Sequence, residues 1–315
     1  MLSIFLNIYK MTSILSFILI FISSLFFSGI LVRTKSIFSG RKGPGIFQPM
    51  KDIWRLLKKG SVYSETSSFI FQIAPSIYFA SVIMAILFIP FGNFPGLISF
   101  KGDFVFFAYV LALGKFFSII GALDTGSSFE GMGASREALY SMLVEPAFFI
   151  LMGSLALLTG HTSFADIFAS LHFGSSISYA IGVLATFVFV IIAMVENSRM
   201  PVDDPKTHLE LTMIHEVMIL DNSGFDLGLI MHAVNLKFAM YGAIIANFFL
   251  TPGYEWYYSI PIFIGAQVLF AIVVGTIESF EARFRMNHNP QFIFMLTSIS
   301  LLIFLGVLLM LGKII

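Results

Sequence analysis

Cysteine is absent from this 315-residue chain. Its absence excludes disulfides, cysteine-ligated zinc and iron–sulfur clusters held by the chain itself, so no cofactor is expected here and any electrons would travel in a partner. Charge is also scarce, at 11% of residues, and Lys plus Arg balance Asp plus Glu at 18 each. Because there is no basic excess, no nucleic-acid partner is expected.

Apolar residues dominate what is present, with 57% hydrophobic residues and a mean hydropathy of +0.92. This is too apolar for a soluble domain of this length. A helix needs roughly 20 apolar residues to cross the hydrocarbon layer, and eight segments are long enough: about 11–32, 69–91, 104–123, 138–159, 177–195, 229–251, 258–279 and 291–312. We therefore expect an all-α, polytopic protein of the lipid bilayer with eight transmembrane helices in a single domain over 1–315.

Lys and Arg are distributed unequally between alternate loops. Thirteen of the eighteen lie in four loops, at 33–68, 124–137, 196–228 and 280–290, whereas the opposite side holds Lys10, Lys101 and Lys313. Positive loops stay on the cytoplasmic side, so we expect a multi-pass protein of a bacterial or archaeal cytoplasmic membrane with both termini non-cytoplasmic. The remaining two cations, Lys115 and Lys237, fall inside or near spans and are candidates for a buried relay.

The first of these loops predicts a short amphipathic helix that Pro49 could open. At 100° per residue, one face is apolar and the other is polar; the apolar face carries Phe47, Met50, Ile53, Trp54 and Leu57, and the polar face carries Lys51, Asp52, Arg55, Lys58 and Lys59. Such a helix is typical of the membrane surface. An ordinary positive anchor and a docking platform for a soluble partner both remain open.

Two carboxylates mark the start of the fourth span. Glu137 and Glu145 lie eight residues apart, about 80° around a helix, with Ser141 between them. Ionisation is costly for Glu145, about two turns into an apolar helix, so it is the stronger functional candidate. The alternative is a packing role, paired to Arg136 or Lys115.

The segment from Glu196 to Gly224 holds six of the eighteen carboxylates directly after a long apolar stretch: Glu196, Asp203, Asp204, Glu210, Glu216 and Asp221. Clustered carboxylates share protons near neutral pH, and the segment predicts a proton path or ligand cavity. The alternative is a solvated acidic loop. Arg199 follows Glu196 by three, which predicts a local ion pair. His208 and His215 are separated by seven residues without an H-E-x-x-H motif, so no metal site is predicted.

Glu278 is the other acid well placed within a span, near the end of the seventh. It is a proton-path candidate, and an ion pair with Arg283 or Arg285 at helical spacing is the equal alternative.

Several motifs together resemble one family, and the resemblance covers essentially the whole chain. The motif R-R-x-G-P followed by Q-P-x-x-D resembles Arg41, Lys42, Gly43, Pro44, Gln48, Pro49 and Asp52; G-x-x-R with a later Glu resembles Gly133, Arg136 and Glu145; and E-x-x-[RK]-x-P-x-D resembles Glu196, Arg199, Pro201 and Asp203. These are similar to the membrane protein known as subunit 1 of respiratory complex I and to its counterparts in formate hydrogenlyase and hydrogenase-4-type nickel–iron hydrogenases. The L-D-T-G-S wording at Asp124 and the position of Lys237 favour the hydrogenase branch.

The resemblance implies a non-catalytic membrane subunit that anchors a hydrophilic arm and couples electron transfer to proton or Na⁺ translocation. It implies hydrogenase-like or complex I-like large and small subunits and a ferredoxin-like subunit on the cytoplasmic face, antiporter-like membrane subunits, and nickel–iron and iron–sulfur centres in those partners; a quinone is left open. On this basis the proton-path candidates are Glu137, Glu145, Glu196, Asp203, Glu210, Lys237 and Glu278, and the partner-interface candidates are Arg41, Lys42, Asp52, Asp124, Arg136, Arg199, Asp204, Glu216 and Asp221. A stand-alone cation/proton transporter, a quinone-site subunit and a purely structural anchor are the alternatives.

Overall fold

The computed structural model describes residues 2–92, 94–171, 176–203, 213–250 and 256–312, with side chains at all of these except 2–12, 176–178 and 256. The described residues form helices joined by loops: α1 (Leu2–Phe38), α2 (Gln48–Leu57), α3 (Phe69–Ile86), α4 (Asp103–Asp124), α5 (Ser128–Thr159), α6 (Phe164–Leu171), α7 (Ser176–Glu196), α8 (His215–Met218), α9 (Gly224–Asn247), α10 (Trp256–Phe280) and α11 (Asn289–Met310).

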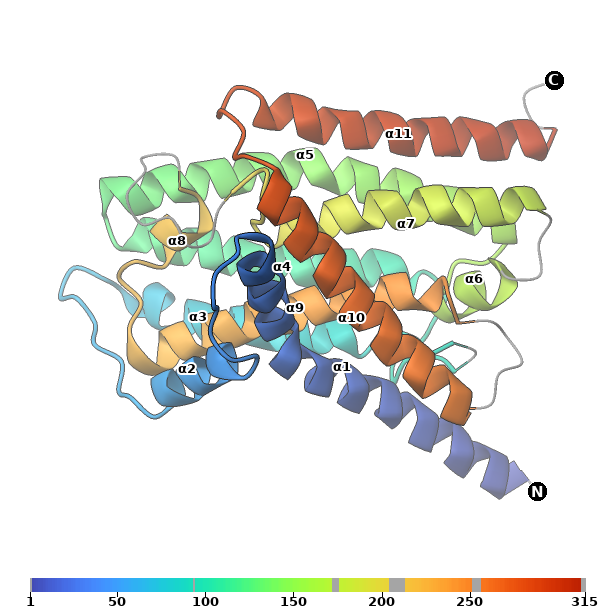
Figure 1. Cartoon of the computed structure of the whole chain (residues 1–315), viewed down its shortest axis with the longest axis horizontal. Coiled ribbons are helices and arrows are strands. Elements are labelled where there is room, and N and C mark those ends of the chain that lie inside the picture. Colours follow the sequence, from blue (N-terminus) through green and yellow to red (C-terminus); the bar gives the residue numbers. More distant parts are fainter. Residues whose placement is uncertain (1, 93, 172–175, 204–212, 251–255, 313–315) are drawn as a thin grey trace.

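Among the described helices, eight are long and apolar enough to cross a membrane. Several, such as α5, α7 and α11, run along the long axis of the molecule, whereas α1 and α10 slant across it (Figure 1). The helix α3 packs along α4, α5 along α11 and α1 along α10. The helix α1 begins and α11 ends at the same end, on the right in Figure 1, while α2 and α8 lie at the other, which we call the loop end. The predicted all-α polytopic architecture is confirmed.

The predicted spans differ from the helices mainly at their ends. The helix α5 begins at Ser128, ten residues before the predicted span at 138, and α3 stops at Ile86 rather than 91. Hydropathy identifies only the part of a helix that is apolar enough for hydrocarbon. The helix α5 also includes a more polar stretch before that part, so it begins earlier than the predicted span. Pro90 lies beyond the end of α3 and disfavours helical backbone at the residue before it, so the helix does not continue to residue 91. The short helices α6 and α8 were not predicted.

The chain folds back after α1 and so brings α2 to the side of the bundle. A Cβ at Gly43 would overlap the Ser36 side chain, and one at Gly29 would overlap the Ile46 backbone, so both glycines permit this return. Phe47, at the start of α2, then meets Phe26 of α1 edge-on with ring centroids 5.3 Å apart. The predicted amphipathic helix is therefore present, and it begins well below the end of α1.

The central helix of the bundle is α9. Every side chain from Leu236 to Asn247 is buried, and this stretch includes Lys237, which is 1% exposed. A buried ammonium must be paired with acceptors because its desolvation is otherwise too costly. The packing of α9 therefore dictates that carboxylates gather around Lys237.

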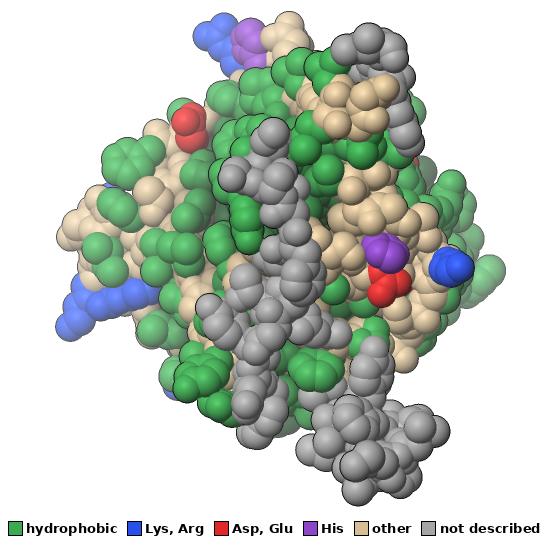
Figure 2. Space-filling model, turned by 90° about the vertical axis from the view of Figure 1, so that its right-hand side faces the viewer, with side chains coloured by type: hydrophobic (Ala, Val, Ile, Leu, Met, Phe, Trp, Pro, Cys, Tyr) green, Lys and Arg blue, Asp and Glu red, His purple; other side chains and the backbone are tan. Residues whose placement is uncertain are grey.

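Figure 2 looks onto the end where α1 begins and α11 ends. Charged side chains are few there and scattered among apolar and neutral polar atoms in the part of the chain that is described. No basic patch is visible on this described surface, in keeping with the uneven distribution of Lys and Arg along the sequence.

Candidate functional site

Four charged side chains from four helices meet inside the bundle, and we call them the buried quartet: Lys115 (α4), Glu137 (α5), Glu196 (α7) and Lys237 (α9). Lys115 Nζ lies 3.3 Å from Glu137 Oε1 and 2.9 Å from Glu196 Oε1, and Lys237 Nζ lies 2.9 Å from Glu196 Oε2. Lys115 also donates to Ser141 Oγ at 2.6 Å, and Lys237 to the Glu196 carbonyl at 2.7 Å. The two positive and two negative charges alternate, so each lies beside an opposite charge.

The end of α7 sets the direction of Glu196. Directly after it, Ser198 adopts a left-handed φ of 49°, and its hydroxyl donates to Glu137 Oε2 at 3.3 Å. This turn ends the helix, so Arg199 no longer stands one helical turn above Glu196. The predicted Glu196–Arg199 pair is wrong: Glu196 binds two lysines, and Arg199 lies 3.7 Å from Glu278. The i, i+3 rule fails because the helix stops between the two residues.

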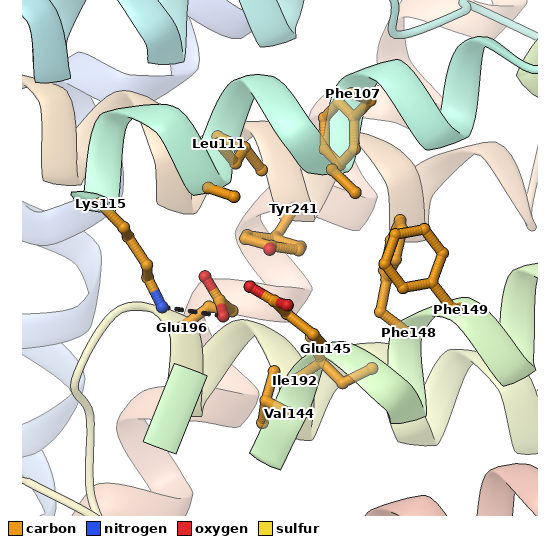
Figure 3. A pocket seen from close by; sticks show the side chains of 12 residues that line it. Phe107, Leu111, Lys115, Val144, Glu145, Phe148, Phe149, Ile192, Glu196 and Tyr241 are labelled. Carbon is orange, nitrogen blue, oxygen red and sulfur yellow. Dashed lines mark hydrogen bonds and ion pairs between the residues drawn. The ribbon is translucent and has the colours of Figure 1, made fainter. Parts of the chain in front are cut away.

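Glu145 reaches the lateral surface of the bundle. It lines a cavity of about 40 Å³ together with Lys115, Glu196 and Tyr241, which we call the lateral cavity. In Figure 3 the Glu145 carboxylate points toward that of Glu196, while phenylalanine side chains line the opposite part of the pocket. Glu145 itself is exposed, and no described residue forms an ion pair with it. Glu137 and Ser141, by contrast, are buried beside Lys115, and the alternative packing pair of Glu145 with Arg136 or Lys115 is not observed.

A second, water-sized cavity of about 10 Å³ lies on the other side of the quartet. We call it the inner cavity; Lys115, Glu137, Glu196 and Lys237 line it together with His215. Burial lowers the pKa of the His215 imidazole from its usual 6.5. The nearby positive charges of Lys237, Arg199 and Lys115 lower it as well, and the negative charge of Glu137 opposes this by raising it. The neutral form of the His215 imidazole is therefore favoured at this position.

His215 also borders a much larger cavity at the loop end, which we call the chamber. Its volume is about 460 Å³, it lies between α1, α2, α8 and α9, and its wall is mainly apolar. The polar side chains that reach it are Ser28, Gln48, Asp52, Arg199, His215, Glu216 and Asn235. His215 is shared by the chamber and the inner cavity, and Lys115 and Glu196 by the inner and lateral cavities. Ionisable groups thus connect the loop end to Glu145.

Asp203 holds the segment that carries His215. Its carboxylate lies 2.7 Å from Arg283 Nη2 and accepts the backbone N–H groups of Ile214 at 3.2 Å and His215 at 3.1 Å. The Asp203 side chain is fully buried. Asp203 thus joins the loop that contains Arg283 to the segment that contains Ile214 and His215. Its role in a proton path stays a prediction.

Gly133 and Arg136, two motif residues of α5, secure the other side of the same segment. Arg136 Nη1 donates to the Met213 carbonyl at 3.0 Å. A Cβ at Gly133 would lie 2.8 Å from the Ile214 carbonyl oxygen and 3.0 Å from Met218. The spacing of this glycine and arginine is therefore explained by the close approach of α8 to α5.

Gly133→Ala is expected to destabilise the protein by about 1–3 kcal/mol, because the added methyl forces a backbone carbonyl to move. Thermal unfolding of the detergent-solubilised chain measures this loss. Gly153→Ala is the matched control: Gly153 lies in the same helix and a Cβ there meets nothing within 4 Å. The control should be neutral or slightly stabilising. Equal melting temperatures for the two variants would contradict the packing account.

Glu278 forms a second group of ion pairs closer to the loop end. Its carboxylate lies 3.0 Å from Lys35 Nζ of α1 and 3.7 Å from Arg199 Nη1. The expected alternative, a pair with Arg283 or Arg285, is wrong, because α10 ends at Phe280 and Arg283 turns to Asp203.

The partner-interface candidates are dispersed over the loop end. Arg41, Lys42 and Asp221 are exposed, and Asp52 and Glu216 line the chamber. Asp124 caps the start of α3 by accepting the N–H groups of Ser68 at 2.8 Å and Phe71 at 3.2 Å. Asp204 and Glu210 lie outside the described residues. Asp124 therefore has a structural role in capping α3. The interface roles of all these candidates stay predictions.

The sequence did not single out Glu130, which is fully buried in the first turn of α5. Its carboxylate accepts the Asp221 N–H at 2.9 Å and so ties the end of the α8 segment to α5. An acid in the first turn of a helix is common, so nothing in its local pattern distinguishes it. Lys115 was recognised as a buried cation, but its pairing with both Glu137 and Glu196 was not.

Comparison with known proteins places this arrangement in a family. Residues 10–309 match the family model described as NADH dehydrogenase. The chain is 33% identical to hydrogenase-4 component C of Escherichia coli over 231 residues, 72% of this chain and 71% of that one. It is 27% identical to formate hydrogenlyase subunit 4 of the same organism, over 84% of this chain and 87% of the relative. It is 26% identical to a subunit of NADH-quinone oxidoreductase from Neorickettsia sennetsu, over 68% and 70%.

A solved structure shares the fold. A chain of the archaeal membrane-bound sulfane sulfur reductase, a respiratory membrane complex, superposes with a TM-score of 0.80 at 18% identity, covering 95% of this chain and 99% of that one. The family match and the sequence relatives confirm the resemblance that the motifs indicated. The chain belongs to the NADH dehydrogenase family of membrane proteins, whose members include membrane subunits of hydrogenase-4, formate hydrogenlyase and NADH-quinone oxidoreductase.

Proposed function

We propose that this chain is the membrane-anchor subunit of a hydrogenase- or complex I-related redox complex and that it couples electron transfer in its partners to proton or Na⁺ translocation. The observation that carries the proposal is the continuous set of ionisable groups from the chamber, through His215 and the buried quartet, to Glu145. Coupled carboxylates and lysines at short distance change their proton occupancy together when one of them is perturbed.

The loop end is the side that would face the soluble subunits, on the cytoplasmic side of the membrane. Exposed Arg41 and Lys42 lie there, and so do exposed Phe38 and Phe280, whose rings meet at 5.3 Å. Exposed aromatic and cationic groups together suit a docking surface for protein. A redox-driven movement of partner subunits at this face would act on the α8 segment, which carries His215.

The lateral surface at Glu145 supports a membrane partner. A carboxylate facing lipid within a span is costly, and Glu145 is exposed on the outer side of α5. A neighbouring membrane subunit of the antiporter-like kind, with a polar group opposite Glu145, would cover it and receive the proton. The path therefore has a donor side at the chamber and an acceptor side at this surface.

Glu145→Gln tests the coupling role. The amide keeps the size of the side chain but cannot carry a proton, so the complex should assemble and turn over electrons while ions moved per turnover fall at least about tenfold. Proton uptake by the purified complex in liposomes, measured with a pH-sensitive dye alongside redox turnover, gives the ratio. Asp166→Asn, an exposed acid of α6 away from the path, is the matched control. If Glu145→Gln moved as many ions per turnover as the unchanged protein, the chain would be a structural anchor without a coupling role.

The alternative of a stand-alone transporter makes a different prediction. Cation exchange by this chain alone in liposomes would replace the coupling proposal, because a coupling subunit needs its redox partner to move ions.

The size of the chamber favours one further candidate, a site for a quinone. A volume of about 460 Å³ with a mainly apolar wall and a few polar side chains fits a small lipid-soluble ligand. A photoreactive quinone would then label residues of α2 or α8 in the intact complex, and excess unlabelled quinone would prevent it. If excess unlabelled quinone did not decrease the labelling, a quinone site in the chamber would be excluded.

A further inference from the structure

The outer face of α2 combines aromatic and cationic side chains in a way the buried quartet does not explain. This face consists of Phe47, Lys51, Trp54, Arg55 and Lys58, all exposed, with Phe47 and Trp54 at 56% and 55%. Lys58 Nζ stands 5.1 Å from the centre of the Trp54 ring. Lys51 and Lys58 flank Trp54 at helical spacings of three and four residues.

The inner face of α2 is occupied by the protein itself. Ile53 is 2% exposed, and Leu56 and Leu57 lie within 3.2 Å of the position that a Cβ on Gly228 of α9 would take. The helix is thus fixed against the bundle and cannot turn Trp54 inward. Two large aromatic rings remain on the side that faces away from α9.

The depth of α2 indicates what surrounds that side. The two residues just before it, Ile46 and Phe47, contact Gly29 and Phe26 of α1. Gly29 lies nine residues before the end of α1, about 14 Å below it at 1.5 Å per residue. The span predicted from hydropathy ends near residue 32, so α2 lies at the level where hydrocarbon gives way to headgroups. Trp is enriched at this level because its ring is apolar and its N–H is polar.

We propose that the outer face of α2 binds the headgroup of an anionic phospholipid. Lys51, Arg55 and Lys58 would surround the phosphate and Trp54 would lie at the headgroup level beside it. Three exposed cations stand on this face, and Asp52, the acid among them, forms a 3.4 Å ion pair with Arg55 and accepts from Gln48. A basic aromatic surface at the interface attracts anionic lipid, with each cation adding to the affinity. Soluble subunits would dock on the end surface around Arg41 and Lys42, whereas this face of α2 lies at the side of the bundle, below the end of α1.

The chain offers an internal probe for this site, because it contains only two tryptophans, Trp54 and Trp256. In the Trp256→Phe variant, fluorescence reports on Trp54 alone. The full chain is reconstituted in phosphatidylcholine vesicles containing either brominated phosphatidylglycerol or brominated phosphatidylcholine at equal mole fraction. We expect both lipids to quench Trp54 and the brominated phosphatidylglycerol to quench it more strongly at low mole fraction, because it is enriched at the site.

Lys51→Gln with Lys58→Gln should lower the preference for phosphatidylglycerol by about tenfold or more while quenching by phosphatidylcholine persists. Persistent quenching shows that α2 still lies at the membrane. The matched control, Lys101→Gln with Arg285→Gln, removes two exposed cations elsewhere and should keep the preference. Equal quenching by the two lipids, or an unchanged preference in the Lys51/Lys58 variant, would overturn the proposal. Absence of quenching by both lipids would show that Trp54 does not face lipid, and would overturn the proposal too.

Discussion

Glu196→Gln is expected to destabilise the protein by about 3–5 kcal/mol, the largest effect of any single change in the buried quartet. Glu196 accepts from Lys115 and Lys237 at 2.9 Å each, and Lys237 is almost completely buried. Without the carboxylate, Lys115 retains Glu137, but Lys237 loses the only anion within 4 Å of it among the described residues. An uncompensated buried charge costs about this much. Denaturant or thermal unfolding of the purified chain measures the loss.

A compensating variant separates this electrostatic cause from a loss of packing. Glu196→Gln combined with Lys237→Met removes one charge of each sign and replaces the buried ammonium by an apolar group of similar length, so most of the lost stability should return. Glu281→Gln, an exposed acid just after α10, should change stability by less than about 0.5 kcal/mol. If the double variant were less stable than Glu196→Gln, the pairing would not be the reason for the loss.

Asp203→Asn is expected to release the segment that carries His215. The Asp203 carboxylate, which lies 2.7 Å from Arg283, becomes a neutral amide, so the ion pair is lost. This loss should weaken the docking of residues 213–218 by about 3 kcal/mol and speed the exchange of their amide hydrogens by roughly 100-fold. Hydrogen–deuterium exchange with mass spectrometry resolves this segment from the rest of the chain. Since His215 lies between the chamber and the inner cavity, ion translocation per turnover should fall in the same variant.

The exchange pattern of Asp203→Asn has a defined control. Arg283→Gln should produce the same local release, and the two changes together should cost much less than their sum because they remove one interaction. Amides of α9 from Leu236 to Asn247 should stay protected in every variant. Unchanged exchange at 213–218 in Asp203→Asn would show that Gly133 and Arg136 hold the segment without this ion pair.

The sequence predicted the elements of the site better than their pairing. The carboxylates Glu137, Glu145 and Glu196 and the cation Lys237 were recognised because charge within apolar stretches is rare and therefore visible in the sequence. Their partners were predicted from helical spacing, as for Glu196 with Arg199, and this was wrong because α7 ends between the two. Glu130 was missed altogether, since an acid in the first turn of a helix is unremarkable.

The sequence by itself determined the eight spans, the amphipathic helix α2 and the family, because hydropathy, periodicity and motif spacing are local properties of the chain. Only the tertiary structure decided that Lys115 meets Glu196 across 81 residues of sequence and that Lys237 contacts Glu196 across 41. Such pairs depend on how each helix is rotated and tilted against its neighbours, and this is set by packing around α9. The same packing decided that His215 borders two cavities and that Glu145 faces outward.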